Sequence, residues 1–408
     1  MMRLSRSGAG LLATALLLTS VVGCVGSSSR AGPETGDSAS PQPTAATAGG
    51  TRDGGNRPRG WERVVTAECG MGARLGSVTV RGWNPHTWKR LWERSFAVTG
   101  KIAFGSGPDA FLTPLFDLCR TDPLKAAYQS DALERVVPRA RAVFDRNFTR
   151  MAVVLYGPDG GREESHVGFV DVQEDGAGDL ITDLTERGGD GGQAPREENA
   201  VFSPDGARIW FTYRASDGRR RIGSRSVTGD SSLKDEGPAT DRNLPLFVVG
   251  EPQRGIQAEM VRLSPDGRLM TARTDELNGK VLFEVPAAST ALTPGTAKGA
   301  RELEGCYHAV GWTGSDTVLC RTAEGDIRTF GTSASAAPGP VLVPANGTVN
   351  EGMVVSPDGR RFVFVKHPPG DPYEGFQGFY ASGTAPGEQP EKLPVDSLEG
   401  RTLFLEWR

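Results

Sequence analysis

The chain has 408 residues, of which 37% are hydrophobic, and its formal net charge is −4. This length allows one large domain or two ordinary domains, and the apolar content is low but sufficient for a core. The slightly acidic balance excludes a chain-wide basic field of the kind that attracts nucleic acid, so no nucleic-acid partner is expected.

The first 23 residues are typical of an export signal. Arg3 and Arg6 precede the apolar run Ala9–Val22, which is too short to span a bilayer comfortably. The following residues, Val21–Cys24, resemble a bacterial lipobox. This resemblance implies cleavage before Cys24 and lipid attached to its thiol, and two or more acyl chains anchor a protein stably. We therefore expect the protein on the outer, extracytoplasmic face of a bacterial cell membrane, anchored by lipid at Cys24. An ordinary signal peptide with an incidental cysteine is the alternative.

Residues 24–60 are rich in Gly, Ser, Thr, Pro and Ala. Such a composition cannot bury enough apolar surface to offset the conformational entropy lost on ordering. As a flexible chain, this tether would have a typical reach of roughly 30–35 Å. The expected organisation is a signal peptide (1–23), a tether (24–60) and a single folded domain (61–408).

Two strands are predicted at the start of the folded domain. The segments Gly76–Trp83 and Trp88–Val98 are rich in apolar and aromatic residues and flank a turn at 84–87. Further on, the spacing of apolar residues from Asp122 to Val137 predicts a short helix that stops before Pro138. The rest of the segment 99–140 has no assigned element.

The tetrapeptide Ser-Pro-Asp-Gly occurs three times, each time between two apolar segments. The copies are Ser203, Pro204, Asp205 and Gly206; Ser264, Pro265, Asp266 and Gly267; and Ser356, Pro357, Asp358 and Gly359. In such a turn the serine bonds back to the backbone, proline presets φ, and glycine accepts the positive φ that closes the reversal. These residues are predicted to be structural turns.

Two degenerate copies of the same pattern begin at Arg141 and His308. Each copy has a short apolar strand, a turn, a second apolar strand, a glycine-containing turn and a third strand. The anchors before the first turn are Phe144, Phe202, Leu263, Trp312 and Val355, and they are 43 to 61 residues apart. Such a period suits four short antiparallel strands plus loops of unequal length.

These copies resemble the TolB-type, WD-like β-propeller repeat over about residues 140–408. The resemblance implies blades of four strands around a channel. The final segment, Arg401–Arg408, reads as the first strand of a blade, and the sequence ends before any turn. We expect it to pair into an N-terminal blade, which would remove exposed sheet edges. The expected fold is all-β, a six-bladed propeller with one short helical insertion; seven blades stay possible because 99–140 is unexplained.

Four cysteines lie in the folded domain: Cys69, Cys119, Cys306 and Cys320. An even number in an exported domain predicts two disulfides. Three pairings are possible, and the local pairing, Cys69–Cys119 with Cys306–Cys320, is preferred. The chain has no CxxC and its four histidines show no ligand spacing, so neither a metal nor a cofactor is expected.

A search for catalytic motifs finds no nucleophile elbow, phosphate-binding loop, dinucleotide fingerprint or HExxH, so no catalytic residue is assigned. His166 and His308 are expected to be structural. The basic segment Gly218–Arg225 could touch an anionic polymer, but a solvated hairpin tip is preferred. The tryptophans at 83, 88 and 92 could stack on sugars, but burial is preferred, with Trp88 and Trp92 sharing one strand face.

The function expected from these observations is that of a cell-envelope lipoprotein. Its propeller would bind or scaffold a protein or an envelope polymer without catalysis. The alternative is an extracytoplasmic enzyme acting on glycans or peptides at the channel mouth. Carboxylates or histidines converging in that mouth, with shifted pKa values, would favour the enzyme.

Overall fold

The computed structural model describes residues 62–70, 76–102, 114–119, 140–156, 165–172, 181–187, 196–203, 205–238, 262–266, 268–274, 279–284, 301–369, 377–395, 398 and 402–408. The expected signal, Cys24, the tether and the helix at 122–137 lie outside these residues, as do Pro204 and Gly267 of the turns. Within the described ranges, no helix is long and apolar enough to cross a membrane.

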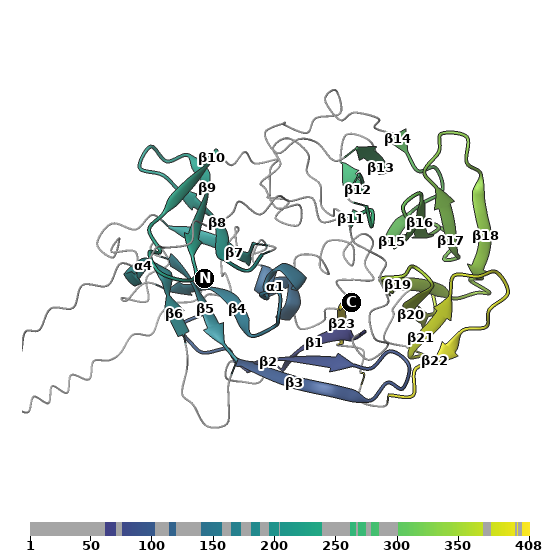
Figure 1. Cartoon of the computed structure of the whole chain (residues 1–408), viewed down its shortest axis with the longest axis horizontal. Coiled ribbons are helices and arrows are strands. Elements are labelled where there is room, and N and C mark those ends of the chain that lie inside the picture. Colours follow the sequence, from purple (N-terminus) through teal and green to yellow (C-terminus); the bar gives the residue numbers. More distant parts are fainter. Residues whose placement is uncertain are drawn as a thin grey trace, which may run out of the picture. The chain divides into compact units, whose positions relative to one another are not determined.

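The described chain forms an all-β structure of five four-stranded sheets and one three-stranded sheet, every strand pair antiparallel (Figure 1). Each sheet is built from consecutive strands, except that the N-terminal sheet also includes the last strand of the chain. Small antiparallel sheets that follow one another in chain order are typical of a propeller-like fold.

The N-terminal sheet has the order β23-β1-β2-β3. Its strands are β1 (Val64–Gly70), β2 (Ser77–Trp83), β3 (Arg90–Ala97) and β23 (Leu403–Trp407). Strands β2 and β3 were predicted, and the last strand does join this sheet. It pairs with β1, however, with Val64 opposite Trp407, and β1 was missed in the sequence. Trp88 precedes β3 at a φ of +54°, so its predicted common strand face with Trp92 is wrong.

The second sheet contains β4 (Arg150–Tyr156), β5 (Ser165–Asp171) and β6 (Ile181–Asp183), and the third contains β7 (Glu197–Phe202), β8 (Arg208–Arg214), β9 (Arg220–Ser226) and β10 (Lys234–Pro238). Met151, Ala152 and Val153 are consecutive and at most 1% exposed. Successive side chains of a strand point to opposite faces, so both faces of the second sheet are covered. Phe144 forms a single bridge to Met151 beside β4.

The remaining sheets repeat this plan. The fourth sheet comprises β11 (Arg262–Leu263), β12 (Leu269–Thr274), β13 (Gly279–Glu284) and β14 (Arg301–Glu302). The fifth sheet comprises β15 (His308–Gly314), β16 (Thr317–Arg321), β17 (Ile327–Gly331) and β18 (Pro338–Val343). The sixth sheet comprises β19 (Val349–Val355), β20 (Arg361–His367), β21 (Phe379–Gly383) and β22 (Glu391–Lys392). The four residues Phe362–Val365 of β20 are fully buried, so the sixth sheet is also covered on both faces.

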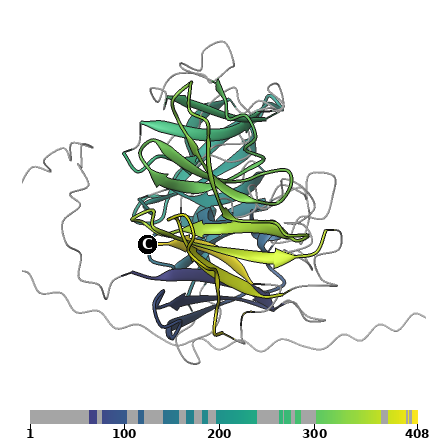
Figure 2. The same cartoon turned by 90° about the vertical axis from the view of Figure 1, so that its right-hand side faces the viewer.

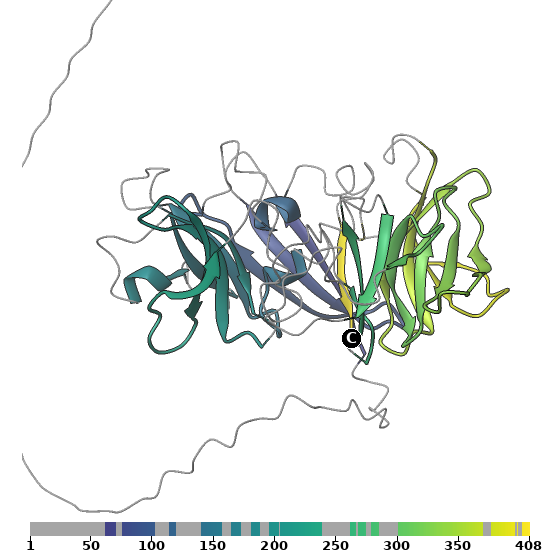
Figure 3. The same cartoon turned by 90° about the horizontal axis from the view of Figure 1, so that it is seen from above.

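Neighbouring sheets pack mainly through their first strands. Strand β11 contacts β15, β15 contacts β19, and β19 contacts β23. The green and yellow strands of the fifth and sixth sheets lie side by side in Figure 2, and β23 lies beside the N-terminal strands in Figure 3. At the last of these joints, the rings of Phe379 and Phe404 are 4.9 Å apart. Apolar burial at such joints is what holds successive sheets together.

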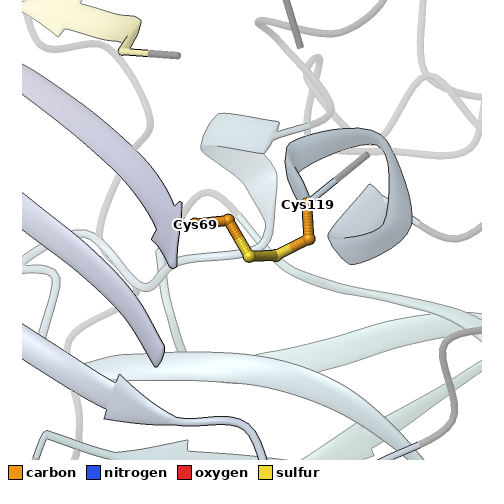
Figure 4. The surroundings of a disulfide bond; sticks show 2 residues. All are labelled: Cys69 and Cys119. Carbon is orange, nitrogen blue, oxygen red and sulfur yellow. A yellow bond between two sulfur atoms is a disulfide. The ribbon is translucent and has the colours of Figure 1, made fainter. Parts of the chain in front are cut away.

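Both disulfides have the local pairing that the sequence favoured. Cys69 at the end of β1 is bonded to Cys119, the last residue of α1 (Pro114–Cys119), as Figure 4 shows. Leu115 and Leu118 of α1 are buried, and the helix contacts β1 and β7. The second disulfide joins Cys306 to Cys320 of β16. The short helix α4 (Leu184–Arg187) follows β6, and residues 140–142 are also helical.

Candidate functional site

The three Ser-Pro-Asp-Gly segments form one hydrogen-bonded turn each. In the best described copy, the Ser356 hydroxyl donates to Asp358 at 2.6 Å and accepts the Arg361 N–H at 2.9 Å. The Gly359 N–H donates to the Ser356 carbonyl, and Asp358 accepts the Arg360 N–H. Ser203 and Ser264 make the same hydroxyl contacts in their turns. These polar groups are occupied by the turn itself, which fits a structural role.

The turn aspartates are held ionised by these contacts. Burial alone would raise the pKa of Asp358, but hydrogen bonds from Ser356 and the Arg360 backbone outweigh it, so the pKa lies below its ordinary value. Hydrogen bonds from Ser264 and Arg268 lower the pKa of Asp266 to about 2. A general acid or base needs a pKa near the working pH, so neither carboxylate suits proton transfer near neutrality.

The turns also set the distance between sheets. Gly359 has a φ of +72°, and a Cβ placed on it would overlap with the Thr313 carbonyl oxygen of the fifth sheet. Gly206 lies against Asp145 and Arg146 of the segment before β4 in a related way, although with more room. At Gly359 the glycine is therefore required both by its own backbone conformation and by close approach to the preceding sheet.

The degenerate first copy keeps the turn, although its four residues, Asp145–Phe148, all differ from Ser-Pro-Asp-Gly. The Asp145 N–H bonds the Arg150 carbonyl and the Phe148 N–H bonds the Asp145 carbonyl, as in the intact turns. Asp145 replaces serine and accepts the Thr149 and Arg150 N–H groups. Phe148, at a φ of +57°, occupies the place of glycine and is fully buried. A bulky residue in this region is strained, and such strain persists only where the surroundings enforce it.

A charged cluster lies between the fifth and sixth sheets. Glu351 of β19 lies 3.1 Å from the His308 Nδ1 of β15, within hydrogen-bond distance, and forms an ion pair with the Arg321 Nε of β16 at 2.9 Å. The side chains of these residues are only 5–10% exposed. Arg321 also lies 4.5 Å from the centre of the Tyr307 ring, and Tyr307 is 40% exposed. The cluster therefore connects a buried ion pair to an aromatic side chain at the surface.

His367 of β20 borders the same cluster. Burial is the largest cause that lowers the pKa of His367, and repulsion from Arg321 lowers it further. The Pro368 carbonyl and Glu351 raise the pKa but do not outweigh burial. Its Nδ1 lies 2.8 Å from the Pro368 carbonyl oxygen and must carry a proton, because a carbonyl only accepts. His367 is thus held neutral near pH 7, with its tautomer set by the backbone.

A second cluster lies where β7 meets β5. The side chains of Glu197 and Arg225 are 0% exposed, and one Glu197 oxygen accepts both Nε and Nη2 of Arg225, at 2.9 and 2.7 Å. The other Glu197 oxygen accepts the Val167 N–H and lies 3.4 Å from the Thr185 hydroxyl. Burial raises the pKa of Glu197, and Arg225, Val167 and His166 oppose it. Nearby, His166 Nδ1 lies 3.1 Å from Asp183.

Carboxylates thus converge with histidines and arginines, but each carboxylate is held by these partners inside the protein. Within the described residues, no group of three His, Cys, Asp or Glu side chains is arranged to hold a metal ion. His166 and His308 were considered from the sequence, but the partners that they or their neighbours find were not: Glu197, Arg321, Glu351 and, beyond its place in the basic segment, Arg225. No local pattern could have found these four, because the partners are 28 residues apart or more, or become neighbours only when sheets pack.

The basic segment Gly218–Arg225 does not form a uniform cationic tip. Arg219 is exposed, but Arg221 is paired with Asp235 and Arg225 is buried against Glu197. The three tryptophans are largely internal: Trp83 and Trp88 are buried, and Trp92 is partly buried.

No protein-family model matches this chain, and no curated protein matches it. The chain is similar to the solved structure of TolB from Acinetobacter baumannii, with 13% identity, coverage of 84% of this chain and 83% of that chain, and a TM-score of 0.32. It is also similar to the periplasmic gluconolactonase PpgL of Pseudomonas aeruginosa, with 12% identity, coverage of 85% of this chain and 82% of that chain, and a TM-score of 0.32. A protein from Lactobacillus plantarum matches with 9% identity, coverage of 81% of each chain and a TM-score of 0.36. At such low identity and TM-score, neither an activity nor a ligand passes from these proteins to this chain.

Proposed function

We propose that this protein is a lipid-anchored component of the bacterial cell envelope whose β-sheet domain binds or scaffolds a protein or an envelope polymer without catalysis. In this proposal lipid on Cys24 holds the domain at the outer membrane face and residues 24–60 act as the tether. The six sheets are six propeller blades, and pairing of β23 with β1 closes the ring. The pairing itself and the antiparallel sheets support this arrangement.

The observation that carries the non-catalytic proposal is the state of the two buried carboxylates. Glu351 is shared between Arg321 and His308, and Glu197 is shared between Arg225, a backbone N–H and a hydroxyl. A catalytic carboxylate must reach a substrate proton or carbon. Each of these carboxylates instead joins two neighbouring sheets and is shielded from solvent.

The binding proposal is tested by capture from the cell envelope. The full chain, crosslinked in detergent-solubilised envelope and recovered, should enrich the same protein or polymer reproducibly. Membrane attachment is tested with the Cys24→Ala variant, which should move from the membrane fraction to the soluble fraction. Retention of this variant in the membrane would exclude lipid at Cys24 as the anchor. Absence of any reproducible partner would exclude a scaffold.

One observation favours the alternative, an enzyme acting on glycans or peptides. The His308–Glu351 pair lies beside Tyr307, whose exposed ring could contact a substrate. Turnover of a glycan or peptide panel by the wild type, lost in Glu351→Gln and unchanged in the exposed control Glu388→Gln, would establish the enzyme. Loss of stability in Glu351→Gln without any wild-type turnover supports the binding module.

A further inference from the structure

Five arginine side chains gather where the N-terminal sheet meets the second sheet. They are Arg63 before β1, Arg94 on β3, Arg141 and Arg146 before β4, and Arg408 after β23. The backbones of Arg63 and Arg408 bond each other in both directions, at 2.6 and 2.9 Å. An Arg408 Nη1 donates to the Arg146 carbonyl, and Arg94 Nη1 donates to the Asn147 carbonyl. We call this set the arginine seam.

Aromatic rings hold these guanidinium groups in place. The guanidinium carbons of Arg141 and Arg408 lie 4.4 and 5.3 Å from the centre of the Phe148 ring. The Phe148 ring is 6.0 Å from that of Trp92, over which Arg94 lies at 5.0 Å. Cations over aromatic faces are stabilised by the ring quadrupole. The strained φ of Phe148, where the intact turns have glycine, therefore places an aromatic platform under two of the arginines.

The seam has more cations than anions. The carboxylates beside it are Glu406, which pairs with both Arg141 and Arg408, and Asp145, which already accepts N–H groups of Thr149 and Arg150. Neighbouring Glu93 is engaged by Arg81 and Arg90. Among the described residues, five guanidinium groups thus face two carboxylates.

This excess charge is partly shielded from water. Burial lowers the pKa of Arg408, and repulsion from Arg63, Arg141 and Arg146 acts in the same direction, against attraction by Glu406. Arginine nevertheless stays protonated in proteins, so the repulsion is not relieved by loss of a proton. Among the described residues, Arg63 Nε and Arg408 Nη2 are buried nitrogens with no hydrogen-bond partner. A bound anion would reduce the repulsion between the guanidinium groups.

We propose that the arginine seam binds a phosphate group. A phosphate offers several acceptor oxygens and up to two negative charges, and guanidinium forks match it with paired hydrogen bonds. A single carboxylate offers two oxygens and one charge, which leaves more of the seam unneutralised. The source of the phosphate is either free inorganic phosphate or the headgroup of a membrane phospholipid. The site does not depend on the function proposed above.

The variant that tests the site is Arg63→Gln with Arg146→Gln. Neither side chain has a described ion pair, since the described role of Arg146 is made by its carbonyl. The matched control is Arg219→Gln with Arg360→Gln, which removes the same charge at exposed positions outside the seam. Circular dichroism and thermal unfolding verify folding. If the double variant does not fold, Arg146→Gln alone replaces it, because Arg146 is exposed.

Binding of inorganic phosphate to the full chain is measured by calorimetry, with chloride at equal ionic strength as the reference. Flotation of the Cys24→Ala protein with phosphatidylglycerol or phosphatidylcholine vesicles forms the second arm. The double variant should weaken phosphate binding about tenfold or more, and the control should stay within about twofold. Selective, Arg63- and Arg146-dependent flotation with phosphatidylglycerol assigns a lipid headgroup, and phosphate binding without flotation assigns a soluble phosphate. The proposal would be overturned if phosphate bound no more strongly than chloride and flotation did not distinguish phosphatidylglycerol from phosphatidylcholine, or if the control variant lost as much binding as the double variant.

Discussion

At the scale of single residues, the repeated turn is set by where its glycine lies as well as by its conformation. Gly359 and Gly218 have almost the same φ, +72° and +76°, but only Gly359 lies against another sheet. Nothing lies within 4 Å of a Cβ placed on Gly218. A substitution at Gly218 therefore tests backbone strain alone, whereas one at Gly359 tests backbone strain together with the close approach of another sheet.

We predict that Gly359→Ala destabilises the fold more than Gly218→Ala. Backbone strain at positive φ costs about 1–2 kcal/mol at both positions, and overpacking against Thr313 adds about 1–3 kcal/mol at Gly359 alone. Urea unfolding of both variants measures the difference. Equal losses would mean that the turn does not control the spacing of the fifth and sixth sheets.

A second residue-scale prediction concerns pH. Because burial lowers the pKa of His367 below its ordinary 6.5, the unfolded chain binds a proton that the folded chain does not in the window just below pH 6.5. The free energy of unfolding should therefore fall as pH falls through this window, by at most about 1.4 kcal/mol per pH unit from this group. The His367→Gln variant should show a shallower slope between pH 7.5 and 5.5. The matched control is His86→Gln, which changes an exposed histidine.

At the scale of elements, α1 depends on its disulfide. A helix of six residues is not stable by itself in water, and α1 is held by Cys69–Cys119 together with buried Leu115 and Leu118. The expected helix at 122–137 falls outside the described residues, and α1 carries no amphipathic repeat long enough to be predicted. Its position was decided by a covalent bond to a distant strand.

We predict that replacing Cys69 and Cys119 with serine releases α1 before it affects the sheets. Amides of residues 115–119 should exchange more than tenfold faster, while those of β20 keep their protection. The chain-entropy model gives a loss of about 4 kcal/mol for this loop and about 3 kcal/mol for the shorter Cys306–Cys320 loop. The matched variant, Cys306→Ser with Cys320→Ser, should leave the exchange of α1 unchanged. Unchanged exchange in the first variant would show that packing alone holds the helix.

At the scale of the whole molecule, the joint between the two ends of the sequence completes the N-terminal sheet. Strand β23 pairs with β1 on one side and contacts β19 of the sixth sheet on the other. Leu403 and Phe404 are almost completely buried there. Without this strand, β1 would present an open edge to solvent.

We predict that removing residues 402–408 lowers the midpoint of thermal unfolding by more than about 10 °C and promotes association through the open edge of β1. Loss of one buried phenylalanine alone costs about 3–5 kcal/mol, and this deletion removes a whole strand. A peptide of residues 402–408 added in excess should restore part of the stability, whereas a scrambled peptide should not. A truncated chain as stable and monomeric as the full chain would contradict the proposed closure.

Local chemistry was sufficient to predict much of the architecture. Proline and glycine preset the Ser-Pro-Asp-Gly turns, and the apolar segments around them predicted strands such as β8 and β20, because both depend only on residues within a few positions. Strand β1 was missed because one of its two partners, β23, lies more than 300 residues away. The same holds for α1, whose place depends on Cys69.

What the sequence alone determined is therefore the all-β class and the repeated turn, whereas for the cysteines it only favoured the local pairing that the structure shows. The tertiary structure decided which charges meet: Glu351 with His308 and Arg321, Glu197 with Arg225, and the five arginines of the seam around Phe148. The physical reason is the distance along the sequence over which each interaction acts. Turn and strand preferences act along a few residues, whereas these ion pairs form only when separate sheets pack together.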